Sequence, residues 1–91
     1  MLKPRYTTQF KKDFKAIVKR GYKTSLLEEV IQLLCDERPL PEKNRDHALV
    51  GRFVGFRECH IQPNWLLIYK AEQEILTLTL TRTGTHSDLL E

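Results

Sequence analysis

Leucine and threonine alternate strictly from residue 76 to residue 81, and this alternation constrains the fold more than any other feature of the chain. Successive side chains of a β-strand point to opposite faces, so one face of this segment is all leucine and the other all threonine. A strand of this kind is half buried and needs an apolar layer against its leucine face. We therefore expect residues 75–81 to form a strand in a sheet that is covered on one face and open on the other.

Three further segments are predicted to complete a four-stranded sheet. Residues 65–70 are apolar on both faces, which is typical of a central strand. Residues 53–61 precede them, and Gln62-Pro63-Asn64 forms the turn between the two strands. Residues 3–6 give a weaker strand signal near the N-terminus.

Two helices are predicted between the first strand and the second. Apolar residues recur from residue 10 to residue 18 at the spacing of one buried helix face, Thr7 or Thr8 can cap that helix, and Gly21 ends it. Ser25-Leu26-Leu27-Glu28 resembles a capping box for a second helix, which runs to about residue 37 before Pro39 and Pro41. The order is β-α-α-β-β-β. With 91 residues, the chain is expected to form a single α+β domain, residues 1–91, with a helix hairpin on one face of a small, mostly antiparallel sheet.

Charge is distributed unevenly along the chain. Residues 1–23 carry eight Lys/Arg and one acid, whereas residues 24–91 carry seven Lys/Arg and eleven acids. Lys11, Lys15, Lys19 and Lys23 are spaced four apart and form one basic ridge on the first predicted helix, which suggests a polyanion or an acidic protein as partner. The alternative is a solvated helix face without a partner.

The composition also excludes several classes of protein. The longest apolar run is five residues, far short of a membrane span, and the N-terminus leads into no signal region. Two cysteines make no disulfide framework, so the chain is expected to be cytoplasmic with reduced thiols.

The three histidines, His47, His60 and His86, all lie in the second half of the chain, near the ends of predicted strands or in loops. A lone histidine in a small domain is usually a surface or packing residue, but three of them in one half, two with polar or charged neighbours, leave a functional site and a structural role about equally open. The residue spacing disfavours zinc, and no metal ligand or cofactor is expected. Cys59 should point away from His60 on its strand, which disfavours a Cys–His nucleophile.

Histidines and arginines without a metal suit phosphodiester transfer in RNA. The ribose 2′-hydroxyl attacks the adjacent phosphate, so one group must accept that proton and another must protonate the departing 5′-oxygen. Arginine stabilises the charge that develops on the phosphate, and Arg57 and Arg82 flank the histidines in sequence. These patterns are compatible with such a nuclease but do not single it out.

Longer motifs carry a resemblance to a known family. They are Asp46-His47-Ala48-Leu49, the run from Gly55-Phe56-Arg57-Glu58-Cys59-His60 through Tyr69, and Arg82-Thr83-Gly84-Thr85-His86-Ser87. Together with the rest of the chain, they resemble the YafQ branch of the RelE/ParE toxin superfamily.

The resemblance implies a RelE-like fold and a bacterial ribonuclease that cuts mRNA in the ribosomal A site, held inactive by a cognate antitoxin. His86 would be the general acid, and His60 or His47 the base or a phosphate ligand. Glu58 would orient an imidazole, and Arg82 would lie near the scissile phosphate. Arg57, Asn64 and Leu90 are expected to bind the substrate. Lys11, Lys15 and Lys19 are expected to dock on ribosomal RNA.

The chain departs from the pattern of the branch at three positions. Glu58 replaces an aspartate, Asn64 replaces an aspartate that could act as a base, and Leu90 replaces an aromatic residue that could stack on a nucleobase. Two other functions share the same fold: a ParE-like toxin that binds DNA gyrase without cutting RNA, and a degenerate toxin that only binds its antitoxin. The histidine spacing favours the nuclease.

Overall fold

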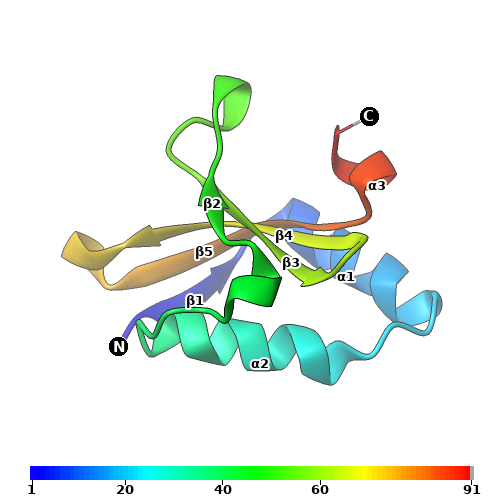
Figure 1. The fold of residues 1–91 in the computed structure, drawn as a ribbon, viewed down its shortest axis with the longest axis horizontal. Helices are drawn as coiled ribbons and strands as arrows, with labels where there is room; N and C mark the ends of the chain where they lie inside the picture. The colour runs from blue at the N-terminus through cyan, green and yellow to red at the C-terminus, as the bar shows by residue number, and fades with distance from the viewer. Residues whose placement is uncertain (91) are drawn as a thin grey trace.

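The computed structural model describes residues 1–90, apart from the side chain of Leu90, and its centre is one mixed sheet (Figure 1). The strands lie in the order β1-β5-β4-β3-β2, so the sheet has five strands and not the four predicted. The bounds are β1 (Lys3–Tyr6), β2 (His47–Ala48), β3 (Arg57–Gln62), β4 (Trp65–Glu72) and β5 (Thr77–Gly84). β2 escaped prediction because it has only two residues, although it pairs His47 directly with Glu58.

Pairing in the sheet is mostly antiparallel, as predicted. β2, β3, β4 and β5 pair antiparallel in succession, and β1 pairs parallel with β5. The alternating segment begins at Thr77 because Leu76 adopts a left-handed backbone with φ 49°. Its leucines Leu78 and Leu80 are fully buried, as predicted for the leucine face, whereas Thr79 on the other face is also buried and Thr77 and Thr81 are partly exposed.

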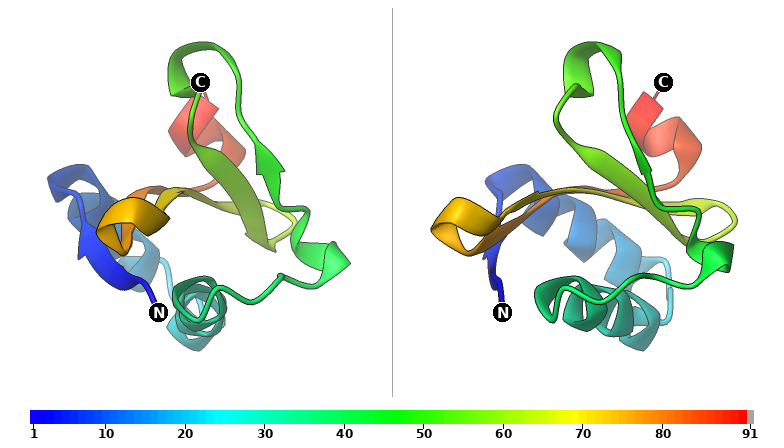
Figure 2. Two further views of the ribbon diagram at one scale, coloured as in Figure 1. Left: turned by 90° about the vertical axis from the view of Figure 1, so that its left-hand side faces the viewer. Right: turned by 60° about the vertical axis from the view of Figure 1, so that its left-hand side comes forward.

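Two long helices lie on the same side of the sheet (Figure 2). α1 (Thr8–Lys19) begins as predicted, with the Thr7 side chain accepting a hydrogen bond from the Phe10 N–H, and Gly21 follows at φ 81°. α2 (Thr24–Cys35) has Lys23 at its N-cap and no side-chain cap bond, so the predicted capping box at Ser25 is wrong. The apolar faces of both helices and the adjacent sheet face form the main core, which includes Phe10, Ile17, Leu27, Val30, Cys59, Trp65, Leu67, Leu78 and Leu80.

The opposite face of the sheet is partly covered, contrary to the prediction that it is open. The segment 49–56 and α3 (His86–Leu90) rise from this face (Figure 1), and Leu66, Ile68 and Leu89 form a second, smaller core there. Residues 53–56 of this segment were expected to begin the strand predicted over residues 53–61. Gly51 and Gly55 have φ 69° and 93°, which breaks the extended backbone and delays β3 until Arg57.

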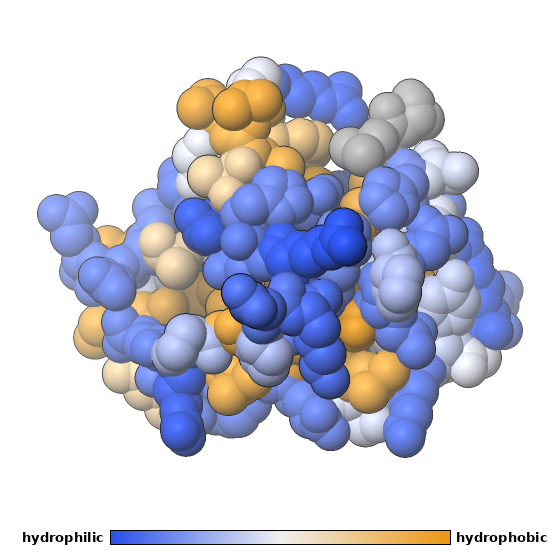
Figure 3. Space-filling model, in the orientation of Figure 1, coloured by the Kyte–Doolittle hydropathy of each residue, from blue (hydrophilic) through white to orange (hydrophobic). Residues whose placement is uncertain are grey.

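A space-filling view shows hydrophobic atoms at the upper end of the molecule, where Figure 1 places segment 49–56 (Figure 3). Val50 and Val54 are highly exposed in that segment. Among the described residues, no helix has the length and apolar character needed to cross a membrane.

Candidate active site

His86 is fixed at the first position of α3 by the side chain of Asn64 in the β3–β4 turn. The Asn64 Oδ1 atom accepts a hydrogen bond from the His86 backbone N–H at 3.3 Å and lies 2.7 Å from His86 Nδ1. Because a backbone N–H can only donate, the amide oxygen must face His86, and Nδ1 must carry the hydrogen of the second bond. The geometry leaves Nε2 as the nitrogen with which His86 can meet a ligand.

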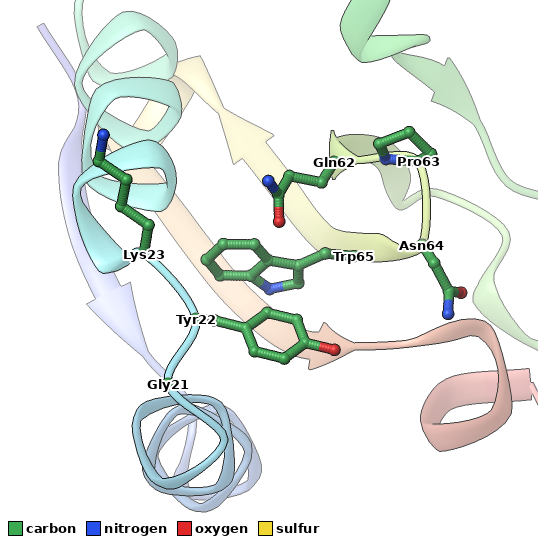
Figure 4. Close-up of a pocket in the computed structure, with 7 residues that line it drawn as sticks. All are labelled: Gly21, Tyr22, Lys23, Gln62, Pro63, Asn64 and Trp65. Atoms are coloured by element: carbon green, nitrogen blue, oxygen red, sulfur yellow. The ribbon is translucent and has the colours of Figure 1, made fainter.

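Figure 4 shows that the Asn64 side chain points toward the start of α3, away from the rings of Tyr22 and Trp65. Tyr22 and Trp65 line a hollow of about 520 Å³, together with residues of the α1–α2 connection and of the β3–β4 turn. Substrate binding by Asn64 stays a prediction, and the contact that the structure shows for its side chain is with His86.

Asp88 holds α3 at the end of β5. Its carboxylate accepts a hydrogen bond from the Thr85 N–H at 2.9 Å and pairs with Arg20 of the α1–α2 connection at 2.8 Å. The Arg20 hydrogen bonds and the Thr85 N–H lower the pKa of Asp88 to about 2. A Cβ atom at Gly84 would lie 2.9 Å from Asp88, so this close approach requires glycine.

His60 faces His86 across the open end of the sheet. The two ring centroids are 5.8 Å apart, with the rings near an edge-to-face arrangement. The Nδ1 atom of His60 lies 3.3 Å from the Pro63 carbonyl oxygen, and the His60 carbonyl accepts a 2.7 Å bond from Asn44 Nδ2. The structure therefore brings together two of the three predicted histidines.

His47 belongs to a second pair, with Glu58 on the neighbouring strand. Its Nε2 atom is 3.4 Å from Glu58 Oε1, and its Nδ1 atom is 2.7 Å from the Arg45 carbonyl oxygen. The Arg45 carbonyl accepts a hydrogen bond from Nδ1, so Nδ1 carries a hydrogen, and the Glu58 carboxylate lies at ion-pair distance from Nε2. Glu58 is buried, and its second oxygen has no hydrogen-bond partner within the described residues. Glu58 thus contacts an imidazole, as predicted, and that imidazole belongs to His47.

Arg57 is joined to Asp46, which also accepts a hydrogen bond from the Tyr69 hydroxyl. The hydrogen bond to Asp46 raises the pKa of Arg57. The pKa of Tyr69 is raised mainly by burial and, to a lesser extent, by its hydrogen bond to the Asp46 carboxylate. No local pattern predicted the Asp46–Tyr69 contact, because it joins residues 23 positions apart.

Arg82 belongs to a different charged group, beside α1. Its guanidinium donates to both carboxylate oxygens of Asp13, at 2.8 and 3.2 Å, and Asp13 also accepts from the Thr83 N–H at 3.1 Å. Asp13, Arg20, Arg82 and Asp88 all line one small hollow of about 250 Å³. The predicted catalytic arginine is therefore already paired with a carboxylate.

The remaining predicted residues lie in varied surroundings. Lys11, Lys15 and Lys19 are exposed on α1, and the predicted contact of Leu90 lies outside the described residues. Cys59 is fully buried in the main core and burial raises its pKa, which confirms that it points away from His60. No group of three or more His, Cys, Asp or Glu side chains suited to a metal ion occurs in residues 1–90.

Sequence reasoning missed two cations beside His60. Lys43 and Arg45 line a hollow of about 310 Å³ together with His60 and Pro63. They lie in the polar segment 42–46, for which no function was predicted. The sequence feature that could have indicated a basic site here is the placement of two cationic residues on either side of Asn44.

Comparison with known proteins finds bacterial toxins that match nearly the full length of this chain. The mRNA interferase toxin YafQ of Escherichia coli K12 is 39% identical over 85 residues, which cover 92% of this chain and 90% of that protein. A metal-bound toxin from Helicobacter pylori has 42% identity and a TM-score of 0.93, covering 99% of this chain and 100% of that one. YafQ in the Escherichia coli DinJ-YafQ complex has 36% identity and a TM-score of 0.91, with both chains fully covered.

A family model matches residues 2–91, almost the entire sequence. The relatives share both the sequence and the arrangement of strands and helices with this chain. On these grounds the chain belongs to the YafQ family of bacterial toxins of type II toxin–antitoxin systems.

Proposed function

We propose that this protein is an endoribonuclease that cuts mRNA, and that His60 and His86 exchange protons with the RNA. The observation that carries the proposal is the facing pair of imidazoles, 5.8 Å apart, with Asn64 leaving the Nε2 atom of His86 available. The YafQ relative from Escherichia coli is named an mRNA interferase, which supports the same activity here.

In the proposed reaction, the 2′-hydroxyl of a ribose attacks the phosphorus of its own 3′-phosphate. His60 accepts the hydroxyl proton through Nε2, which has no hydrogen-bond partner among residues 1–90, and the bond from phosphorus to the 5′-oxygen breaks. Protonated His86 gives its Nε2 proton to that oxygen. The products are a 2′,3′-cyclic phosphate and a free 5′-hydroxyl, so no water or cofactor enters the step.

His47 serves in this proposal as a residue that binds the phosphate, held in place by the Arg45 carbonyl and by Glu58 on the neighbouring strand. Arg57 and the residue at position 90 contact the RNA beside the reacting phosphate. Arg82 is the weakest member of the proposed set, since Asp13 already accepts two hydrogen bonds from it.

The proposed partners are mRNA in the ribosomal A site, ribosomal RNA and a cognate antitoxin. The Escherichia coli relative is seen in a complex with DinJ, which supports a protein antitoxin here. Residues 1–91 act as one domain with a RelE-like order of elements. The exposed lysines Lys11, Lys15 and Lys19 dock on RNA phosphates without reading sequence.

Primer extension on mRNA translated in vitro tests the catalytic proposal. Wild-type protein should produce discrete cuts, and His86→Ala should lower the cleavage rate by about 10²-fold or more, since a positioned acid contributes that much. Glu29→Ala, at an exposed position of α2, is the control and should cut like the wild type. Absence of cleavage by the wild type, together with inhibition of gyrase supercoiling, would replace the nuclease by a gyrase-binding toxin.

Ribosome binding at several salt concentrations tests the lysines. Changing Lys11, Lys15 and Lys19 to Glu should weaken binding more at low salt than at high salt, because phosphate contacts release counterions. Cleavage on saturated ribosomes should fall far less than in His86→Ala. Unchanged affinity and salt slope would show that these lysines form a solvated face only.

A further inference from the structure

A hollow of about 310 Å³ lies beside His60, and two of its lining residues, Lys43 and Arg45, have no role in the reaction proposed above. Lys43, Arg45, His60 and Pro63 line it. His60 thus lines the hollow, and its ring also faces that of His86. A ligand in the hollow would therefore lie beside the His60 imidazole, which in the proposed reaction also meets the reacting phosphate.

The backbone holds the two cations of the hollow in place. Asn44 lies between them, is 5% exposed, and donates a 2.7 Å hydrogen bond to the carbonyl of His60. Arg45 has a left-handed backbone with φ 46°, an unfavourable conformation for a residue other than glycine. Its N–H donates to the Glu42 carbonyl, and its own carbonyl accepts from the His47 ring. The loop carrying both cations is therefore tied to β3 and to His47.

The charge of the hollow is unbalanced. Within the described part of the chain, neither Lys43 nor Arg45 forms an ion pair. No acidic side chain lines the hollow, and the nearest acid along the chain after Arg45, Asp46, is bonded to Arg57 and Tyr69. A guanidinium and an ammonium at one hollow suit a phosphate group, which accepts hydrogen bonds from both.

We propose that Lys43 and Arg45 bind a second phosphate of the RNA strand, the one that flanks the phosphate undergoing cleavage. This inference rests on the proposed nuclease function and adds a substrate subsite to it. The two residues position the strand, since contacts to phosphate fix register and carry no sequence information. They take no part in proton transfer.

An NMR titration of the full-length protein tests the subsite without any cleavage step. The first probe is 2′-deoxyadenosine 3′,5′-bisphosphate, which carries the two phosphates that flank one nucleoside and lacks the attacking hydroxyl. The comparison probes are the 3′- and 5′-monophosphates of 2′-deoxyadenosine. We expect the bisphosphate to bind about tenfold more tightly than either monophosphate, the gain typical of one charge-assisted contact. Amide shifts should appear at Lys43, Arg45 and His60.

Paired variants separate this subsite from general attraction to a basic protein. Lys43→Ala/Arg45→Ala should remove the tenfold advantage of the bisphosphate, whereas Lys3→Ala/Arg38→Ala, an equal loss of charge at exposed positions, should retain it. Equal affinity for all three probes, or an advantage that survives Lys43→Ala/Arg45→Ala, would overturn the inference.

Cleavage measurements with the same variants distinguish a failure of the proposed phosphate subsite from a failure of the proposed nuclease activity. In the Lys43→Ala/Arg45→Ala variant, the substrate concentration at half-maximal rate should rise about tenfold while the maximal rate changes by less than about threefold. If the maximal rate falls as it does in His86→Ala, the two residues are not positioning residues and the inference fails. A wild type that does not cut RNA would refute the nuclease while the titration still decides the subsite.

Discussion

The two faces of the sheet differ in how much they bury and in what they carry. The helix-covered face holds the main core, including Trp65, Leu67, Leu78 and Leu80, and none of the three histidines. On the opposite face, the buried apolar residues among those whose side chains the structure describes are Leu66, Ile68 and Leu89. This face nevertheless carries Glu58 and His60, which alternate along β3 with the core residues Cys59 and Ile61.

This division separates stability from chemistry. Burial of apolar area on the helix side provides most of the folding free energy, so the chemical residues need not contribute to it. The smaller core has a narrower task, which is to hold α3 against the sheet so that His86 faces His60. Variants on the two faces should therefore differ in the ratio of lost stability to lost activity.

The largest effect is expected from Leu67→Ala on the helix side. Leu67 is fully buried, and truncation of such a leucine costs about 3 kcal/mol of unfolding free energy through lost burial and an unfilled cavity. Urea denaturation measures this loss. Cleavage per folded molecule should stay near that of the wild type, and a large loss of specific activity would mean that the two faces are not separate.

Leu89→Ala tests the smaller core and should cost less stability, about 2 kcal/mol. Leu89 is fully buried, but α3 has only five residues and can detach locally, which limits the global penalty to the free energy of docking that helix. Cleavage should fall more than tenfold, because His86 would lose its fixed position. Hydrogen exchange of the α3 amides would report the detachment directly, and unchanged exchange would contradict it.

Substitutions at Asn64 test how His86 is oriented. Asn64→Leu removes the acceptor for the Nδ1 hydrogen and should lower kcat about tenfold with little change in KM, as expected for a lost positioning bond. Asn64→Asp places a carboxylate there, which favours the protonated imidazole. The alkaline limb of the pH–rate profile should then move to higher pH, because a general acid must carry its proton. An unmoved limb in Asn64→Asp would argue against His86 as the acid.

The smallest effect is expected from Asp88→Asn. The pKa of Asp88 lies at about 2 in the folded protein, below the ordinary aspartate value of 3.8, so the carboxylate stabilises the fold above pH 4 and ceases to do so as the pH falls toward 2. At pH 7 the variant should lose about 1 kcal/mol after allowance for solvent screening of the exposed Arg20. Chemical denaturation at pH 7 and pH 2.5 measures both values. A loss of equal size at the two pH values would exclude the charge of Asp88 as its cause.

Periodic patterns predicted the main elements, and local backbone geometry caused the errors. The Leu/Thr alternation and the spacing of Phe10 and Phe14 identified β5 and α1, because burial of one face enforces such periods. Leu76, Gly51 and Gly55 moved strand ends through left-handed conformations that a pattern of apolar residues does not encode. β2 was too short to show a period.

The residue types of the site were predictable, but their pairing was not. His60 with His86, and His47 with Glu58, are brought together by strand register and by the packing of α3, which depend on the whole sheet. Asn64 and Arg82 illustrate the limit. Their partners, His86 and Asp13, lie 22 and 69 residues away, and no local pattern points to them.

The parallel pairing of β1 with β5 has a consequence for the order of synthesis. β1 is made first, yet its one neighbour in the sheet is the last strand, with Lys3 opposite Thr77. Contacts between segments so distant in the chain cannot form until residues 77–80 have left the ribosome, and His86 follows them. A growing chain therefore lacks the His60–His86 pair until residue 86 has left the ribosome, so the ribosome that makes the protein is not exposed to an assembled site before that point.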